Sequence, residues 1–373
     1  MIPSPTSFGT FPGKEVVSLS RKQFTKAVDA DVHPFVMPGE VSAYLPPVWR
    51  TKFEKYGIRP PVPGSVYPRM RNGGYRRDAW PDTFPGNDVD LMKEQLLDLY
   101  DLAAAVLIPL HAHSFGAEHA EFSDALCRGL NDWLTDRFLE KDGRFIGSVS
   151  VPFETPVMAA EEIRRRAADP RFQQVLAPAN TELPMGSPKY WPVLEAACET
   201  GLPLGVHSGG VPSYRLTGPP SYYLEEHCEF SGEMQSVVMS LVLGGTFERF
   251  PELRVVLVEG GIAWAGPLQW SMDALYRTWH SDLPGLRKLP SEYFREHFWL
   301  TTQPIEEPPR ARDLPRAIRQ ADIEDRLLFA SDYPHWDFDA PDHALKDLPK
   351  ELREAVLRTN AESLYRIPAE VAA

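Results

Sequence analysis

Eight short runs of apolar and β-branched residues recur along this 373-residue chain, separated by segments long enough to hold a helix. Several of those segments show the apolar spacing of amphipathic helices. Strands that alternate with helices predict parallel βαβ units. The runs span residues 26–32, 103–110, 144–151, 172–177, 202–206, 254–258, 297–301 and 327–331.

Eight such units are the number that closes into a (β/α)8 barrel, a fold of about 250 residues that tolerates insertions. An open, doubly wound sheet is the alternative, but no run is followed by a Gly-x-Gly-x-x-Gly or Walker-type loop. The pattern therefore favours an α/β fold of the TIM-barrel type. The helical segments cover residues 89–100, 122–140, 156–168, 188–200, 234–249 and 309–320, and Gly201 is expected to end the fourth.

Some regions fall outside the repeat. Residues 1–24 are rich in Pro, Ser, Thr and Gly and predict an N-terminal arm, so that residues 25–373 form a single barrel domain. Residues 34–88 predict an insertion after the first strand, and residues 208–232 predict a long loop after the fifth. An arm and an aromatic insertion gain little stability when they lie free in water, so we expect one or both at a subunit interface. They therefore predict a homo-oligomer, most simply a two-fold dimer.

Composition narrows the possible partners. The net charge of −13, without a basic cluster, argues against nucleic acid. The longest apolar runs, such as residues 102–110, are too short to cross a bilayer, and the N-terminus lacks the apolar core of a signal peptide. Cys127, Cys198 and Cys228 lie far apart, without metal-binding spacing, which predicts a reducing, cytoplasmic compartment. A small molecule remains the expected partner.

The first strand ends in an unusual concentration of charge. In "DADVH", Asp29, Asp31 and His33 alternate with small or apolar residues, so the period of a strand points all three toward one side. In a barrel that side is the interior, and the C-terminal ends of the strands form the active site. Ionisable groups in a packed interior are costly unless they are paired or bind a cation.

Two further strands end in residues of the same kind. His207 follows "LPLGV" at the fifth strand, and Asp332 follows "LLFAS" at the eighth. Taken singly, His207 is explained by a structural hydrogen bond and Asp332 by a helix N-cap. Together with Asp31 and His33 they form a carboxylate and imidazole set that suits zinc first, and also manganese or iron. The combination predicts one catalytic divalent metal ion.

With these motifs the chain resembles the amidohydrolase-related family, in the branch that includes the aminocarboxymuconate-semialdehyde and γ-resorcylate decarboxylases. The resemblance extends from Ala27 to Tyr365 and implies a metal-dependent TIM-barrel enzyme that acts on a small organic substrate, aromatic or carboxylated. The matching stretches are "VDADVH", "LPLGVHSGG", "FERFPELRVVLVEGGIAW", "PSEYFREHFWLTTQP", "LLFASDYPHWDFD" and "NAESLYRI".

The resemblance assigns the family's metal-binding positions to Asp31, His33, His207 and Asp332. Asp31 departs from the commoner His or Glu, which favours harder ions. Glu259 stands where the decarboxylases carry a strand-6 histidine implicated in catalysis. It is either a structural carboxylate or a catalytic one, since it follows "RVVLV" and precedes two glycines. The expected catalytic residues are Asp332, Glu259 and His207.

Other residues are expected to contact the substrate because they follow strands at the catalytic end. They are His111, His113, His227, Trp264, His335 and Trp336. A structural role in their loops is the alternative for His227, His335 and Trp336, and a surface loop explains His111 and His113 equally well.

Three functions follow from this reading. The main prediction is hydrolysis by metal-activated water, with Asp332 as the proton shuttle, because the strand-6 histidine is missing. The alternative is non-oxidative decarboxylation, which the members of this branch favour. The third is a metal-free barrel that serves as a scaffold, which the retained Asp/His set argues against.

Overall fold

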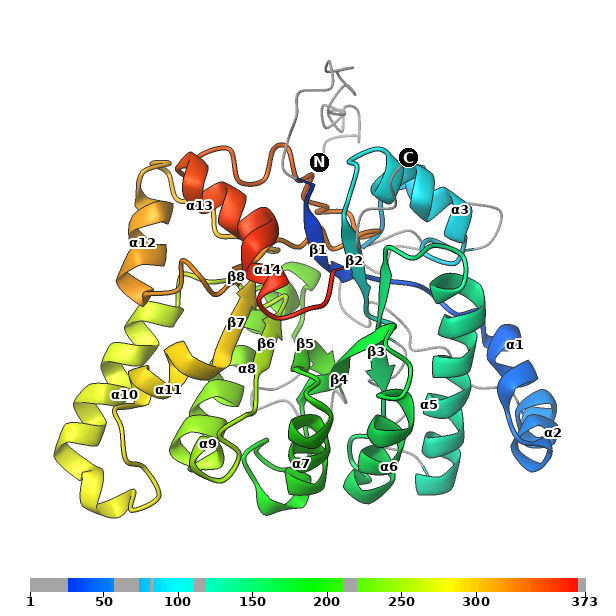
Figure 1. Cartoon of the computed structure of the whole chain (residues 1–373), viewed down its shortest axis with the longest axis horizontal. Coiled ribbons are helices and arrows are strands. Elements are labelled where there is room, and N and C mark those ends of the chain that lie inside the picture. The colour runs from blue at the N-terminus through cyan, green and yellow to red at the C-terminus, as the bar shows by residue number, and fades with distance from the viewer. Residues whose placement is uncertain (1–25, 57–73, 81–83, 111–118, 211–219, 368–373) are drawn as a thin grey trace, which may run out of the picture.

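The computed structural model describes residues 26–56, 74–80, 84–110, 119–210 and 220–367. Eight parallel strands form one sheet in chain order, and helices surround it (Figure 1). The strands are β1 (Val28–Val32), β2 (Ala104–Leu107), β3 (Phe145–Ser150), β4 (Phe172–Asn180), β5 (Leu204–Gly210), β6 (Val255–Val258), β7 (Phe298–Thr301) and β8 (Leu327–Leu328).

The sheet closes between its first and last strands. The N–H of Ala30 donates to the carbonyl of Phe329 at 2.9 Å, and the N–H of Asp332 donates to the carbonyl of Asp31 at 3.1 Å. The predicted (β/α)8 barrel is therefore confirmed. The eighth strand is shorter than predicted because the N–H of Phe329 donates to the carbonyl of Val356 instead of to a neighbouring strand.

Helices cover the outer face of the barrel (Figure 1). No helix in the described part of the chain is both long and apolar enough to cross a membrane. Gly201 ends α7 in the left-handed conformation, as predicted. The helices are α1 (Pro38–Val41), α2 (Pro47–Tyr56), α3 (Val89–Met92), α5 (Ala120–Leu134), α6 (Pro156–Arg166), α7 (Trp191–Thr200), α8 (Tyr223–Leu243), α9 (Thr246–Arg249), α10 (Ala265–Trp279), α11 (Pro290–His297), α12 (Asp313–Ala321), α13 (Lys350–Glu354) and α14 (Asn360–Glu362).

The prediction that residues 208–232 form a loop is wrong for their last part. Helix α8 begins at Tyr223, well before the predicted helical segment. The early turns are polar and so carry no apolar period, but the Glu225 carboxylate accepts the N–H groups of Ser221 at 2.7 Å and Tyr222 at 3.3 Å. A side chain that binds the first N–H groups of a helix stabilises its start.

The sequence analysis also missed two helices between β6 and β7, namely α10 and α11. Helix α10 leaves Trp270, Leu275 and Trp279 more than half exposed, at 53%, 61% and 58%. Large apolar residues on the solvent side blur the periodicity that marks a helix in the sequence. The N-terminal arm remains a prediction, because residues 1–24 lie outside the described part.

A buried polar layer crosses the barrel interior between β3, β4 and β5. The Gln174 amide donates to Ser148 Oγ at 3.1 Å and accepts the hydroxyl hydrogen of Tyr365 at 2.6 Å. Gly205 on β5 makes room for it, because a Cβ there would lie 2.3 Å from Gln174 Cδ. Both hydrogen bonds would have to shift to admit a methyl group.

We expect Gly205→Ala to lower the free energy of unfolding by about 1–3 kcal/mol, the usual cost of overpacking a well-packed core. Chemical denaturation of the two proteins measures the difference. Gly143→Ala is the matched control, since no atom lies within 4 Å of a Cβ built there. Equal stability of Gly205→Ala and the wild type would show that the layer can repack freely.

Candidate active site

His33 lies between two carboxylates at the end of β1. Its Nε2 is 3.1 Å from Asp31 Oδ1 and 2.8 Å from Asp332 Oδ1. Its other ring nitrogen, Nδ1, is 3.0 Å from the carbonyl oxygen of Ile108. Because a carbonyl only accepts, Nδ1 carries a hydrogen and Nε2 is the nitrogen that faces the carboxylates.

His207 on β5 is held in the same way. Its Nδ1 is 2.8 Å from the carbonyl oxygen of Ser208, so Nε2 again points to the cluster. That Nε2 lies 3.1 Å from Glu259 Oε2 and 3.9 Å from Asp31 Oδ2. The imidazole rings of His33 and His207 meet edge to face with centroids 5.1 Å apart. The structure thus brings together the five residues that the sequence analysis assigned to metal binding or catalysis, namely Asp31, His33, His207, Glu259 and Asp332.

Burial governs the charge of these groups, since none is more than 6% exposed. Burial raises the pKa of Asp31 well above its usual range, although His33 partly opposes this. Burial alone would lower the pKa of His33, but Asp31 and Asp332 outweigh it and raise that pKa to about 10. Burial also raises the pKa of Asp332, yet His335 and His33 outweigh this and hold it well below its usual range.

The cluster is short of positive charge. Within the ranges that the structure describes, neither Asp31 nor Asp332 contacts a Lys or Arg, and their ion pairs are with imidazoles alone. Both oxygens of Asp31 and Oδ2 of Asp332 are buried without a hydrogen-bond partner. Buried carboxylates without partners are costly, and a bound cation removes that cost.

The spacing of the donor atoms also fits an ion. One ligand atom from each of Asp31, His33 and His207 lies within 4.8 Å of the others. Ligands about 2.0–2.3 Å from a single zinc-like ion lie at most about 4.6 Å apart, so only a small inward movement is needed. Mixed carboxylate and imidazole ligands are typical of zinc, manganese and iron sites. The residues therefore fit a divalent metal.

Glu259 is a buried carboxyl beside His207. Burial, followed by the charges of Asp332 and Asp31, raises its pKa well above the usual range. Ser208 Oγ donates to its Oε2, and its own N–H donates to Thr301 Oγ1 at 3.0 Å. Both Glu259 and Asp332 adopt left-handed backbone, with φ of 64° and 58°. Such strain in residues other than glycine concentrates at functional sites.

Asp29 shares the strand face of Asp31 but serves another purpose. Its Oδ1 accepts the N–H of Ser331 at 2.9 Å and that of Asp31 at 3.2 Å. Burial, opposed in part by these hydrogen bonds, raises its pKa to about 7. Asp29 therefore ties the end of β8 to β1 and lies outside the candidate metal group.

The residues expected to contact substrate lie in different places. His335 Nδ1 is 2.5 Å from Asp332 Oδ1, and its ring centroid is 4.8 Å from that of His33. Trp336 and His227 lie beside each other with ring centroids 6.3 Å apart. Trp264 instead donates from Nε1 to the carbonyls of the turn after β6, at 2.8 and 3.1 Å. His111 and His113 lie outside the described residues.

Sequence reasoning missed four residues at this site. Tyr75 packs against His335 at 5.3 Å between centroids, but it belongs to the insertion, which carries no motif. Tyr223 accepts the indole hydrogen of Trp336, with 3.0 Å between the two atoms. It lies at the start of α8, in a region predicted as loop. Ser208 and Asp337 could have been found, because each lies within a motif that was already singled out.

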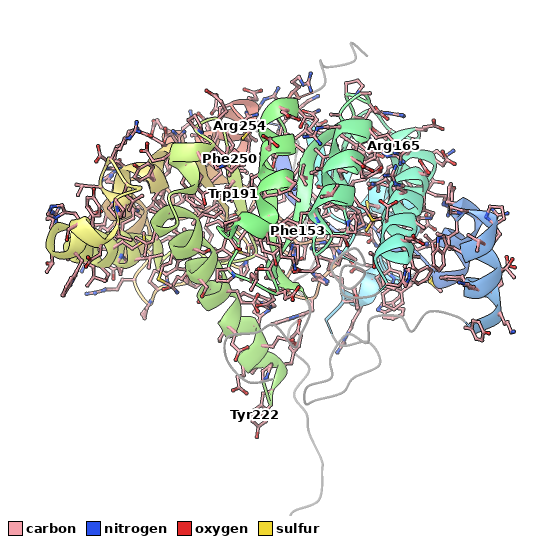
Figure 2. The ribbon with its side chains drawn as sticks, turned by 90° about the horizontal axis from the view of Figure 1, so that it is seen from below. Phe153, Arg165, Trp191, Tyr222, Phe250 and Arg254 are labelled. Carbon is pink, nitrogen blue, oxygen red and sulfur yellow. The ribbon has the colours of Figure 1, made fainter. Side chains whose placement is uncertain are left out.

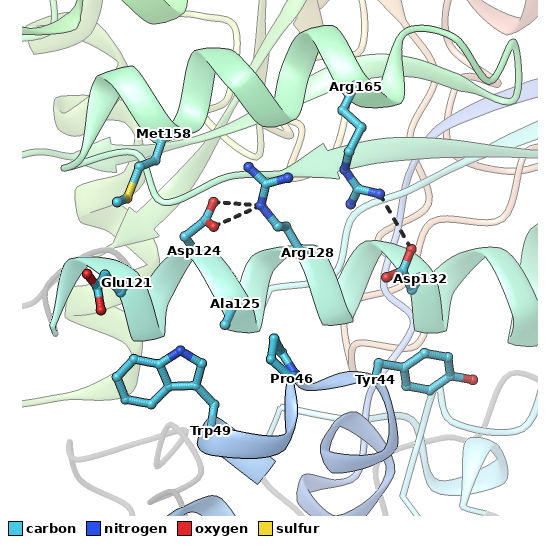
Figure 3. Close-up of a pocket in the computed structure, with 10 residues that line it drawn as sticks. All are labelled: Tyr44, Pro46, Trp49, Glu121, Asp124, Ala125, Arg128, Asp132, Met158 and Arg165. Atoms are coloured by element: carbon cyan, nitrogen blue, oxygen red, sulfur yellow. Dashed lines mark hydrogen bonds and ion pairs between the residues drawn. The ribbon is translucent and has the colours of Figure 1, made fainter.

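A separate groove of about 470 Å³ lies on the outer side of the barrel, between α5, α6 and the start of α2 with the segment before it (Figure 3). Its two arginines are paired with carboxylates, Arg128 with Asp124 at 2.8 Å and Arg165 with Asp132 at 3.9 Å. No imidazole is among the described residues that line it. The groove therefore lacks the chemistry of the strand ends, and the cluster around His33 remains the candidate active site.

Known proteins resemble this chain over most of its length. The γ-resorcylate decarboxylase of a Polaromonas species is 24% identical over 310 residues, which cover 76% of this chain and 92% of that protein. A crystal structure of an amidohydrolase from Mycobacterium avium subsp. paratuberculosis superposes with a TM-score of 0.68 at 19% identity, covering 93% of this chain and 99% of that one.

A dihydroxybenzoic acid decarboxylase from Polaromonas has been solved with manganese and the inhibitor 2-nitroresorcinol. It superposes with a TM-score of 0.61 at 18% identity, and the alignment covers 91% of this chain and 97% of the decarboxylase chain. These structural likenesses show a shared fold. The amidohydrolase family model matches residues 28–367. Since that match takes in all eight strands and the whole candidate site, the chain belongs to the amidohydrolase family.

Proposed function

We propose that this protein is a metal-dependent carboxy-lyase that removes carbon dioxide from a small aromatic carboxylate. The observation that carries the proposal is the buried group of Asp31, His33, His207 and Asp332, whose carboxylates lack a neutralising Lys or Arg among the described residues. The choice of reaction rests on the curated relatives, which are named as γ-resorcylate decarboxylases. They favour decarboxylation, which the sequence analysis gave as the alternative, over hydrolysis, which was its main prediction.

Asp31, His33, His207 and Asp332 are the residues that we propose hold the ion. Manganese is supported by the decarboxylase structure that contains it, and zinc by the imidazole ligands. A divalent ion bound there supplies a Lewis acid that neutralises a substrate carboxylate and a neighbouring oxygen.

Side chains of the protein then donate and accept the protons of the reaction. Loss of carbon dioxide leaves the electron pair of the broken bond on the ring carbon, which must take up a proton. Glu259 can supply it, because burial and the charges of Asp332 and Asp31 favour its protonated form. Asp332 stays ionised beside His33 and His335 and can accept a proton. Two carboxyls whose pKa values move in opposite directions are typical of an acid and base pair.

Aromatic residues at the mouth support an aromatic substrate. Tyr75 and His335 pack together on one side, and Tyr223 and Trp336 are joined by a hydrogen bond of 3.0 Å on another. Trp336 is 50% exposed, so part of this aromatic surface can be reached from solvent. Rings favour stacked or edge-to-face contacts with such side chains.

The compartment and the assembly of the protein stay predictions. Cys127, Cys198 and Cys228 are all free, which supports a reducing, cytoplasmic compartment. Tyr222 and Leu224 at the start of α8 are 59% and 67% exposed, which supports a homodimer or larger homo-oligomer that covers them. We propose both properties on these grounds.

The metal site predicts the metal content of variants. We expect the wild type, expressed with manganese or zinc, to hold about one equivalent of ion, and Asp31→Ala and His207→Ala to hold less than about a tenth, because each loses a ligand. Elemental analysis of the purified proteins measures this. His343→Ala, which alters a side chain that is 61% exposed, should keep the wild-type content. Full metal in Asp31→Ala would remove Asp31 from the site.

Asp332→Asn separates charge from shape. Asparagine tolerates the left-handed backbone at this position, so the variant should fold and keep part of its metal. It lacks the basic carboxylate, and we expect turnover to fall on the order of 10²-fold or more, the usual scale of acid–base catalysis. Asp342→Asn, in the loop that follows, is the matched control. Near-normal turnover in Asp332→Asn would leave Asp332 with a structural role.

The reaction itself is read from the products. Hydroxybenzoates labelled with ¹³C in the carboxylate, assayed alongside lactones and amides, should release labelled carbon dioxide, which mass spectrometry identifies. Release of a hydrolysis product from a lactone or amide, with no carbon dioxide from any carboxylate, would restore hydrolysis as the better assignment.

A further inference from the structure

His227 and Asp337 form a second ionisable pair that the mechanism above does not use. His227 Nε2 is 3.0 Å from Asp337 Oδ2, which also accepts from the amide of Gln303 at 2.7 Å. Because an ionised carboxylate only accepts, Nε2 carries a hydrogen. The other ring nitrogen of His227, Nδ1, has no hydrogen-bond partner among the described residues.

The pair lies next to the candidate metal group. Asp337 follows Asp332 by five positions in the loop after β8, and the charge of Asp337 helps to raise the pKa of Asp31. Burial alone would lower the pKa of His227, but Asp337 and, more weakly, Asp332 outweigh it and raise that pKa. The side chain of His227 is 18% exposed, so a small molecule can reach it from solvent.

Aromatic contacts hold the imidazole in place. The ring of Tyr223 stacks on it at 6.1 Å between centroids and 30°, and that of Phe230 meets it edge to face at 5.1 Å. Helix α8 projects beyond the body of the molecule, with Tyr222 at its tip (Figure 2). A side chain on such a helix would otherwise be mobile, and the bond to Asp337 fixes its orientation.

We infer that His227, oriented by Asp337, is a second recognition point that binds a ring hydroxyl of the substrate remote from the carboxylate held by the metal group. The inference rests on the proposed function for the substrate class. The imidazole binds the hydroxyl group at Nδ1, where it accepts the hydroxyl hydrogen when neutral and donates to the hydroxyl oxygen when protonated, and no covalent bond changes. A half-buried group that is built to bind a hydroxyl discriminates against the analogue that lacks it, because it is then left without a partner.

Binding to the manganese-loaded protein tests this. The probes are 2-hydroxybenzoate and its 2,3-, 2,4- and 2,5-dihydroxy isomers, and isothermal titration calorimetry gives each Kd. We expect one dihydroxy isomer to bind the wild type at least about tenfold more tightly than 2-hydroxybenzoate, as recognition of a substrate hydroxyl requires. His227→Phe keeps a ring for packing and should reduce that preference to less than about threefold. His343→Phe is the matched control and should keep it.

A purely structural role for the pair predicts otherwise, because loss of a helix anchor would weaken all four probes alike and leave their ratio unchanged. The inference is overturned by an unchanged ratio in His227→Phe, or by a wild type that binds no isomer better than 2-hydroxybenzoate. If His227→Phe does not fold, Asp337→Asn carries the test, and its preference must then fall at least about threefold, since the imidazole loses its orienting partner.

The same probes separate this inference from the proposed reaction. A preference that depends on His227, without release of carbon dioxide from any probe, would leave the recognition point standing and refute the carboxy-lyase. If carbon dioxide is released but His227→Phe leaves the ratio of the Kd values unchanged, the carboxy-lyase stands and the recognition point is refuted.

Discussion

One imidazole shared between two buried carboxylates is the interaction on which the active site depends. His33 Nε2 lies within 3.1 Å of oxygens from both Asp31 and Asp332. Without an intervening positive charge these two carboxylates would repel each other in a medium that screens charge poorly. In the structure the imidazole takes that place, which explains why the pKa of His33 is raised to about 10. A divalent ion would meet the same requirement more completely, with the orphaned oxygens as ligands.

The loop after β8 connects this interaction to the rest of the mouth. Within this loop, Asp332 donates its N–H to the carbonyl of Asp31 on β1 and so closes the barrel where the cluster forms. The N–H of Trp336 then donates to the carbonyl of Gly74 at 3.2 Å, and Asp337 binds His227 on α8. One short segment thus joins the metal group, the insertion and the projecting helix. This explains why an apolar strand is followed at once by aromatic and ionisable residues.

Asp332 and Glu259, the two carboxyls that we propose are catalytic, differ because of their neighbours. Asp332 has imidazoles on both sides, and these favour its ionised form over the opposing effect of burial. Glu259 is equally buried but lies near the charges of Asp332 and Asp31, which favour its neutral form. The same side-chain chemistry therefore supplies both the acceptor and the donor of protons that we propose. The exchange of a strand-6 histidine for Glu259 is compatible with decarboxylation on this view, because the site still holds an acid.

The sequence by itself determined the barrel and the candidate metal residues. Eight apolar runs count the strands, and a polar residue at the end of a parallel strand must lie at one rim, so Asp31, His33, His207 and Asp332 could be grouped before any coordinates were known. The tertiary structure decided which neighbours these groups have. Asp29 and Asp31 share a strand face, yet only contacts across the barrel direct Asp29 to Ser331 and Asp31 to the histidines. The start of α8, the packing of Tyr75 on His335 and the bond between His227 and Asp337 also arise from segments distant in sequence. Local periodicity reports which way a side chain points, whereas the partner it meets there depends on how the whole barrel closes.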